Sequence, residues 1–199
     1  VIITDAGLDG NLTKIPDGHP KATAIEVLDR PDARAFATIR NIKTGFYSYP
    51  YRLLECRHAK DPWQNCATVT MSDVYAWTWG TAITLEPTQA EYSFTDVSIN
   101  RSLTESTTPS ATNSCGIYWT EGGMISLQNV SLHSYHTGIR LVDTGDKKIG
   151  WATLKIQGGN FENLFRGLHI THRAMGQTQI AGAHIGRCRL EGILLEQPI

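Results

Sequence analysis

The stretch ISLQNVSLHSYHTGIRLVD, from Ile125 to Asp143, contains two short patterns that are typical of β-strands. In the first, apolar and polar residues alternate up to an Asn at position 129. In the second, a Gly precedes a similar alternation. Alternation at period two puts the apolar side chains on one face of a strand. The stretch is therefore either an isolated hairpin or one copy of a repeat.

The first half of this stretch recurs along the chain as an alternating strand followed by Asn or Asp and a β-branched residue. Its copies begin at intervals of about 25 to 33 residues, which is the range of known structural repeats. The copies are ATIRNI (37–42), ATVTMSDV (67–74), YSFTDVSI (92–99), ISLQNVSL (125–132) and the looser ATLKIQGGNF (152–161) and TQIAGAHI (178–185).

The second half, a small residue followed by apolar-x-apolar, recurs in phase with the first. Its copies are AIEVLD (24–29), YRLLEC (51–56), AITLEP (82–87), GIYWTE (116–121), GIRLVD (138–143), GLHITH (167–172) and GILLEQ (192–197). Such strict alternation of the two halves is not expected by chance. The sequence therefore predicts a repeat architecture rather than a hairpin.

The form of the repeat excludes several architectures. A period of about 28 residues is too long for hexapeptide or nonapeptide solenoids, and neither the leucine-rich pattern nor helical apolar spacing is present. Short strands with Gly, Asn and Asp at the corners predict a parallel β-solenoid whose coils stack about 4.8 Å apart. We expect Asn41, Asp73, Asp96 and Asn129 at one corner, where they can bond local backbone groups or form a ladder.

These features resemble the right-handed parallel β-helix of pectate-lyase-like proteins, and among them bacteriophage tailspikes. The resemblance extends over roughly residues 20–197 and implies an all-β fold with about six coils. An N-terminal loop and first strand would occupy residues 1–23, and the β-helix domain residues 24–199. The resemblance also implies a homotrimer, in a phage virion or outside the cell, that binds and often cleaves bacterial surface polysaccharide.

Composition argues against several other functions. Eighteen Lys and Arg balance nineteen Asp and Glu at a net charge of −1, so no basic surplus indicates a nucleic-acid partner. No apolar run is long enough to predict membrane insertion. No P-loop, dinucleotide fingerprint or HExxH motif occurs, and no cofactor is expected. The cysteines lack CxxC spacing, which favours free thiols over a Cys56–Cys66 loop disulfide.

Aromatic residues with a polar group are candidates for carbohydrate binding, because sugar rings stack on them and polar groups bond the hydroxyls. Tyr75, Trp77 and Trp79 lie close together in one segment, where strand parity does not decide between surface recognition and core packing. In GIYWTE, parity directs Trp119 into the core and Tyr118 outward. Arg140 is also expected on the outer face, beside Asp143.

Carboxylates are candidates for glycosidic cleavage, which uses a general acid and a base or nucleophile. Aligning the isoleucines that open AITLEP, GIYWTE and GIRLVD places Glu121 and Asp143 in one column, with Glu86 one residue earlier. Neighbouring carboxylates raise the pKa of one member of the pair, which supplies an acid near neutral pH. The alternative interpretation is that these are solvated charges at strand ends.

Two histidine pairs, His133-x-x-His136 and His169-x-x-His172, have the spacing of metal ligands on a helix. On a strand, a separation of three puts the side chains on opposite faces, so no metal site is expected. A lyase would need Ca²⁺-binding acids, and no such Asp cluster occurs, which favours a hydrolase. Two alternatives remain: a non-catalytic receptor-binding adhesin or structural spike segment, and a secreted bacterial polysaccharide lyase or hydrolase.

Overall fold

The computed structural model describes residues 1–5, 7–8, 23–29, 35–44, 50–58, 68–86, 90–101, 114–120, 122–142, 152–171 and 175–196. These residues form strands and turns and contain no helix. Every strand pairing among them is parallel. The prediction of an all-β fold with parallel sheets is therefore confirmed. With no helix, the described part of the chain has none that could cross a membrane.

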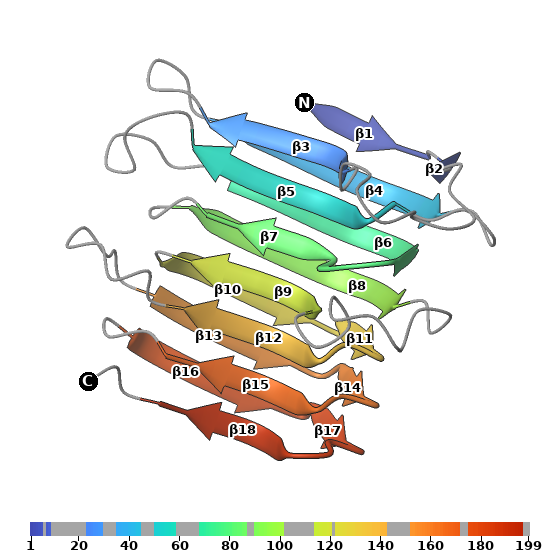
Figure 1. Ribbon diagram of the computed structural model, residues 1–199. Coiled ribbons are helices and arrows are strands. Elements are labelled where there is room, and N and C mark those ends of the chain that lie inside the picture. Colours follow the sequence, from blue (N-terminus) through green and yellow to red (C-terminus); the bar gives the residue numbers. More distant parts are fainter. Residues whose placement is uncertain are drawn as a thin grey trace, which may run out of the picture.

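The described strands form two sheets (Figure 1). The eleven-stranded sheet has the order β1 (Ile2–Thr4), β4 (Phe36–Thr44), β6 (Thr68–Thr78), β8 (Glu91–Arg101), β10 (Gly123–Gln128), β13 (Ala152–Gln157) and β16 (Met175–Ala181), with the short β2 (Gly7–Leu8), β11 (Ser131–His133), β14 (Asn160–Glu162) and β17 (His184–Gly186) beside this path. The seven-stranded sheet has the order β3 (Thr23–Asp29), β5 (Arg52–His58), β7 (Ile83–Leu85), β9 (Cys115–Thr120), β12 (Thr137–Val142), β15 (Arg166–Ile170) and β18 (Glu191–Leu195).

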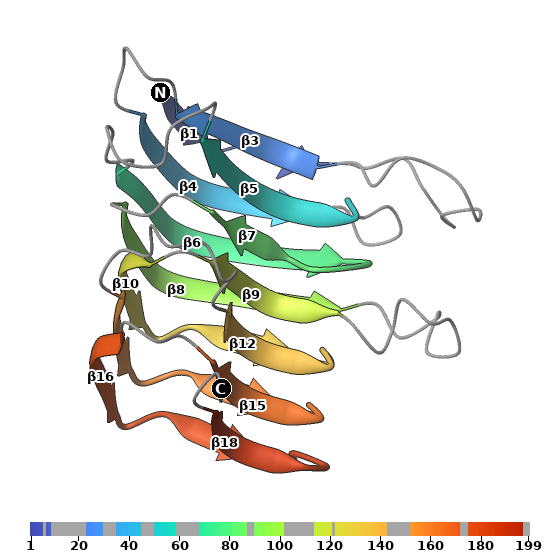
Figure 2. The ribbon, with the colours of Figure 1, turned by 60° about the vertical axis from the view of Figure 1, so that its left-hand side comes forward.

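The chain passes from one sheet to the other and back once per repeat, so that the repeats stack from the N- to the C-terminus (Figures 1 and 2). Each strand pairs with the equivalent strand one repeat later. The register places Ile83 beside Ile117, and Ile117 beside Ile139, which confirms the alignment made from the sequence. This arrangement is compatible with a parallel β-helix, and we call one passage through both sheets a coil.

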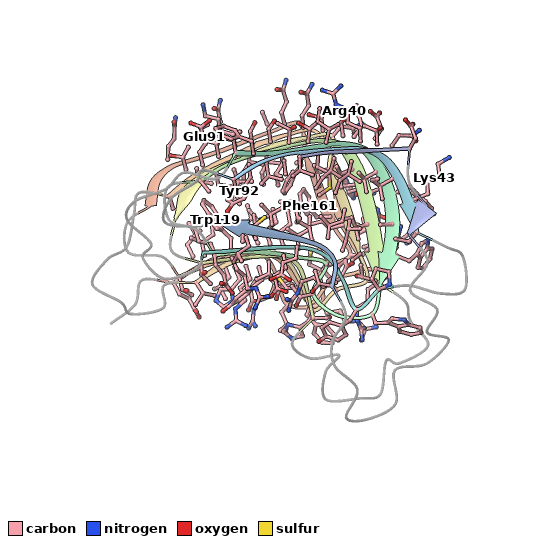
Figure 3. All side chains as sticks on the ribbon, turned by 90° about the horizontal axis from the view of Figure 1, so that it is seen from above. Arg40, Lys43, Glu91, Tyr92, Trp119 and Phe161 are labelled. Carbon is pink, nitrogen blue, oxygen red and sulfur yellow. The ribbon has the colours of Figure 1, made fainter. Side chains whose placement is uncertain are left out.

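The core lies between the two sheets. Figure 3, which looks along the stack, shows Tyr92, Trp119 and Phe161 in this interior, and Arg40 and Glu91 on the outside. Trp119 is fully buried, as strand parity predicted. Because equivalent residues stack from coil to coil, inward positions form apolar columns along the stack. One such column in the seven-stranded sheet consists of Ile25, Leu54, Ile83, Ile117, Ile139, Leu168 and Ile193.

The predicted Asn and Asp corner is present in the eleven-stranded sheet. All its members have a left-handed backbone, a conformation that Asn, Asp and Gly adopt more readily than other residues. The Nδ2 group of Asn41 donates to Oδ1 of Asp5 at 2.6 Å, and that of Asn129 donates to Asp96 at 2.6 Å. In stacking order the corner contains Asp5, Asn41, Asp73, Asp96, Asn129, Gly158 and Gly182, with φ between 49° and 67°.

Close contact between coils explains the glycine that opens three of the second halves. A Cβ atom on Gly138 would lie 2.6 Å from the carbonyl oxygen of Gly167, closer than real Cβ contacts allow. Gly116 is confined in the same way by Gly138, and Gly167 by Gly192. These backbones therefore approach each other more closely than a side chain permits. At Gly192, the nearest atom to an added Cβ is the Ile185 Cγ2 at 3.6 Å, an ordinary contact.

Because only one of two equivalent glycines is confined in this way, Gly→Ala should change the free energy of unfolding differently at positions 138 and 192. Gly138→Ala overpacks the backbone and should lower the free energy of unfolding by about 1–3 kcal/mol. Gly192→Ala has room for the methyl group and should change it by less than about 0.5 kcal/mol. Urea unfolding of both variants measures the difference. Equal destabilisation by the two substitutions would contradict the proposed role of the close contact.

Candidate functional site

One line of side chains, the outer column, runs along the exterior of the seven-stranded sheet. It lies between two inward columns, so its side chains point away from the core. Its chemistry changes along the stack, from acidic through aromatic to cationic. The register of the sheet places in this column Glu26, Glu55, Thr84, Tyr118, Arg140, His169 and Leu194.

The acidic end of the outer column is occupied by internal ion pairs. Glu26 pairs with Arg57 of the next coil, and Glu55 pairs with Arg52. Thr23 also donates its hydroxyl to Glu55 at 3.0 Å. The hydrogen bond from Arg57 to Glu26, together with the nearby carboxylates, raises the pKa of Arg57. The Glu26–Arg57 pair and the Thr23–Glu55 hydrogen bond join neighbouring coils, whereas the Arg52–Glu55 pair lies within β5.

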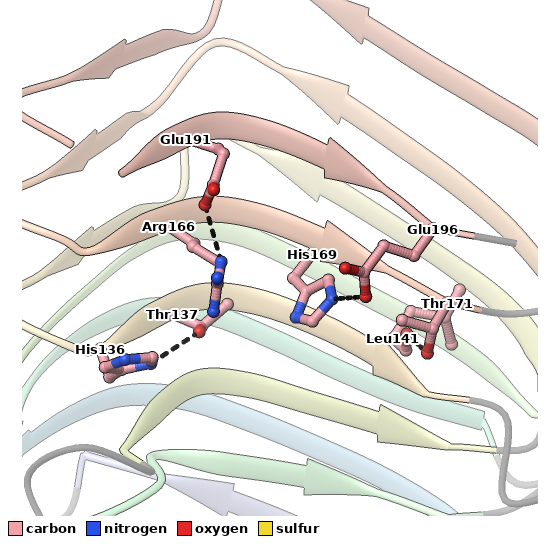
Figure 4. Close-up of polar contacts among 8 residues, drawn as sticks. All are labelled: His136, Thr137, Leu141, Arg166, His169, Thr171, Glu191 and Glu196. Carbon is pink, nitrogen blue, oxygen red and sulfur yellow. Dashed lines mark hydrogen bonds and ion pairs between the residues drawn. The ribbon is translucent and has the colours of Figure 1, made fainter. Parts of the chain in front are cut away.

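The cationic end contains a cluster contributed by β12, β15 and the residues just before them (Figure 4). Arg166 donates its Nε–H to Glu191 at 2.7 Å, and His169 Nε2 lies 2.8 Å from Glu196. The His136 ring stacks on Phe165 with a centroid separation of 5.0 Å. Each contact joins neighbouring coils, so the cluster is held in place by the same stacking that builds the sheet.

The outer column brings together two of the carbohydrate-binding residues predicted from the sequence. Tyr118 and Arg140 are neighbours in the outer column, and both are half-buried. Tyr75 and Trp77 lie instead on β6 of the other sheet, where Tyr75 is 49% exposed and Trp77 is half-buried. Trp79 is only 5% exposed, which leaves its ring no open face for a sugar. The predicted aromatic group is thus divided between two surfaces.

The predicted carboxylate pair, Glu121 and Asp143, lies outside the described residues. The observed register ends one residue earlier, where Thr120 pairs with Val142, and up to that point it agrees with the alignment that placed the two acids in one column. Glu86 is described and half-buried at the end of β7, where its backbone N–H donates to the carbonyl of Cys56. It adds a negative charge near Arg57 and Cys56.

The sequence reasoning missed the cationic cluster because it treated each histidine pair by itself. His133 belongs to β11 in one sheet, whereas His136 precedes β12 in the other. What gathers the histidines is stacking between coils. The second residue after the initial small residue in GIYWTE, GIRLVD and GLHITH is Tyr118, Arg140 and His169, so the alignment contained this signal.

The described residues show little sign of metal or thiol chemistry. Within these ranges no three His, Cys, Asp or Glu side chains are placed to hold a metal ion. Cys56 and Cys115 are buried free thiols, and burial raises the pKa of Cys115 to about 12, which keeps it protonated and unreactive. Cys66, the other half of the disulfide alternative, lies outside the described residues.

A second polar surface lies on the exterior of the eleven-stranded sheet. It is a shallow pocket between β10, β13 and β16. Its polar lining residues are Ser126, Gln128, Lys155, Gln157 and Gln179. It contains one cation and no aromatic ring, so it lacks the combination found at Tyr118 and Arg140.

Comparison with protein families, with curated proteins and with solved structures finds no match for this chain.

The cationic cluster should lower the pKa of a histidine, His136. Burial, followed by the charges of Arg166, Arg140 and His169, lowers the pKa of His136. NMR titration should therefore give a His136 pKa below the ordinary value of about 6.5. Because protonation is disfavoured in the folded state, His136 should reduce stability as the pH falls below about 6.5.

Among these charges, that of Arg166 lowers the His136 pKa most, so Arg166→Gln should raise that pKa. Lys155→Gln removes an exposed cation from the other sheet and should leave it unchanged. An unshifted His136 in the unsubstituted protein, or the same titration after Arg166→Gln, would show that the cluster does not act on this ring.

Proposed function

We propose that this chain is a right-handed parallel β-helix of the tailspike type that binds a bacterial surface polysaccharide along the outer column. The proposal includes closed coils, about six in number, and a virion or extracellular location. It also includes a homotrimer, for which sedimentation equilibrium should give a mass of three chains rather than one. The observation that carries the proposal is that Tyr118, Arg140 and His169 occupy successive positions of the outer column, where the first two are half-buried and His169 is 9% exposed.

Several properties of the outer column suit an extended glycan. Its side chains repeat about every 4.8 Å, so a polymer lying along it meets a polar or aromatic group at each coil from Glu26 to His169. The Tyr118 ring offers an apolar surface with a hydroxyl, and Arg140 offers several N–H donors for sugar hydroxyls. Because the sheet fixes these residues before binding, little ordering is needed when the glycan binds.

The binding surface is tested with a panel of purified capsular and O-antigen polysaccharides. Tyr118→Ala should weaken binding of the best polysaccharide by about tenfold or more, which corresponds to about 1.4 kcal/mol. The matched control is Tyr75→Ala, which removes a 49% exposed tyrosine from the other sheet and should have little effect. If only Tyr75→Ala weakens binding, the surface lies on the other sheet. If no polysaccharide binds, the proposed function is wrong.

Cleavage of the bound glycan is a separate part of the proposal and rests on Glu121 and Asp143. Glu121→Gln and Asp143→Asn should each lower reducing-end release by about 100-fold or more, the usual contribution of a general acid or base. Glu91→Gln, an exposed carboxylate on the other sheet, is the control. Unchanged reducing-end release in both variants would show that Glu121 and Asp143 are not the catalytic pair. Binding without any release by the unsubstituted protein would identify a non-catalytic adhesin.

A further inference from the structure

The cationic end of the outer column concentrates positive charge within two neighbouring coils. Arg140 lies beside His169 in the register, and Arg166 and His136 lie near the starts of the same two strands. Figure 4 shows His136, Arg166 and His169 on the same exterior face. The cluster, defined as Arg140, Arg166, His136 and His169, therefore contains two permanent cations and two rings that can become cationic.

The acids of the described residues pair with only part of this cluster. Glu191 pairs with Arg166, and Glu196 pairs with His169. The Arg140 side chain makes no ion pair or hydrogen bond to another described residue, and its Nε atom is buried without a hydrogen-bond partner. Within the described residues, this guanidinium therefore has one unsatisfied donor and no carboxylate partner. Such groups are costly unless a bound partner satisfies them.

The same cations contribute to the pKa shifts of two neighbouring groups, beside burial for His136 and a hydrogen bond for Glu196. The pKa of His136 is lowered by burial and by three cationic neighbours in turn. The pKa of Glu196 is lowered by its hydrogen bond to His169, with further contributions from the charges of His169, Arg166 and Arg140. Both shifts have the sign expected beside an excess of positive charge. A ligand anion at Arg140 would relieve this excess.

The surroundings of Arg140 contain rings as well as charge. Tyr118 lies one coil away from Arg140 in the outer column, and the Phe165 ring stacks on His136 at the start of the strands. Phe165 is 38% exposed, and the Arg189 guanidinium lies 5.2 Å from its ring centroid. An anionic group attached to a sugar would thus find a cation for its charge and apolar faces for its ring.

We propose that the cluster around Arg140 is an anion-binding subsite that accepts an acidic substituent of the glycan, either a sugar carboxylate or a phosphate. Arg140 binds the oxyanion through its guanidinium, which suits both groups because two N–H donors match two oxygens. His136 and His169 line the subsite, and Tyr118 contacts the sugar ring. The inference rests on the proposed polysaccharide binding and specifies the chemical class of the glycan.

The subsite is tested without the polysaccharide, by NMR titration of the histidine ring signals. The probes are glucuronate, inorganic phosphate and, as the neutral control, glucose. We expect saturable shifts of His136 and His169 with one or both anions and none with glucose. A response to glucuronate alone identifies a carboxylate subsite, and a response to phosphate alone identifies a phosphate subsite.

Two variants decide whether Arg140 is responsible. Arg140→Gln should weaken anion binding at least tenfold, whereas Lys155→Gln should leave it unchanged because Lys155 lies on the other sheet. A thermal midpoint for each variant shows that it is folded. If Arg140→Gln unfolds the protein, Arg166→Gln takes its place and should weaken binding by removing a second cation. Shifts that do not saturate, or that survive these substitutions, overturn the inference.

The two proposals can fail separately. A matched pair of probes, an acidic polysaccharide and its carboxyl-reduced form, distinguishes them for carboxylates. Equal binding of both forms, together with no response to glucuronate or phosphate, would leave polysaccharide binding intact and remove the anion subsite. Saturable anion binding with no binding of any polysaccharide would retain the subsite and remove the proposed function.

Discussion

Backbone hydrogen bonding between successive coils is the interaction on which the rest of this structure depends. Parallel strands in register lie about 4.8 Å apart, and this spacing leaves little freedom at the corners. One corner is left-handed in every described coil that contains it, from Asp5 to Gly182, so Asn, Asp and Gly occupy it. At another point, the backbones of Gly116, Gly138 and Gly167 come too close to those of the next coil for a Cβ atom.

The same stacking gives the exterior its chemistry. A residue facing outward meets its equivalents from the coils before and after it, so a functional surface is a column rather than a local motif. Along the outer column, Glu26 and Glu55 have cationic partners of their own, and the positive charge gathers near Arg140 and Arg166. A ligand that follows this column therefore encounters a gradient of charge, with Tyr118 between the two ends.

Repeat alignment is why so much of the fold could be predicted from the sequence. The pairing of Ile83, Ile117 and Ile139 and the burial of Trp119 follow from period-two alternation and from the repeat alone. Trp79 was less predictable, because it lies where β6 ends and parity no longer indicates which side faces the core. The clustering of His136 with Arg166 depends on contacts between coils, which a pairwise spacing rule does not represent. Glu121 and Asp143 follow the described strands, so strand register does not place their side chains.

We propose that coil stacking creates the glycan-binding surface and that this surface is the outer column. The most direct measurement is a map of backbone amide NMR shifts on addition of the best-binding polysaccharide. The largest shifts should fall on neighbouring strands of the seven-stranded sheet, at Tyr118, Arg140 and His169. Shifts concentrated instead at Ser126, Lys155 and Gln179, on the eleven-stranded sheet, would contradict it.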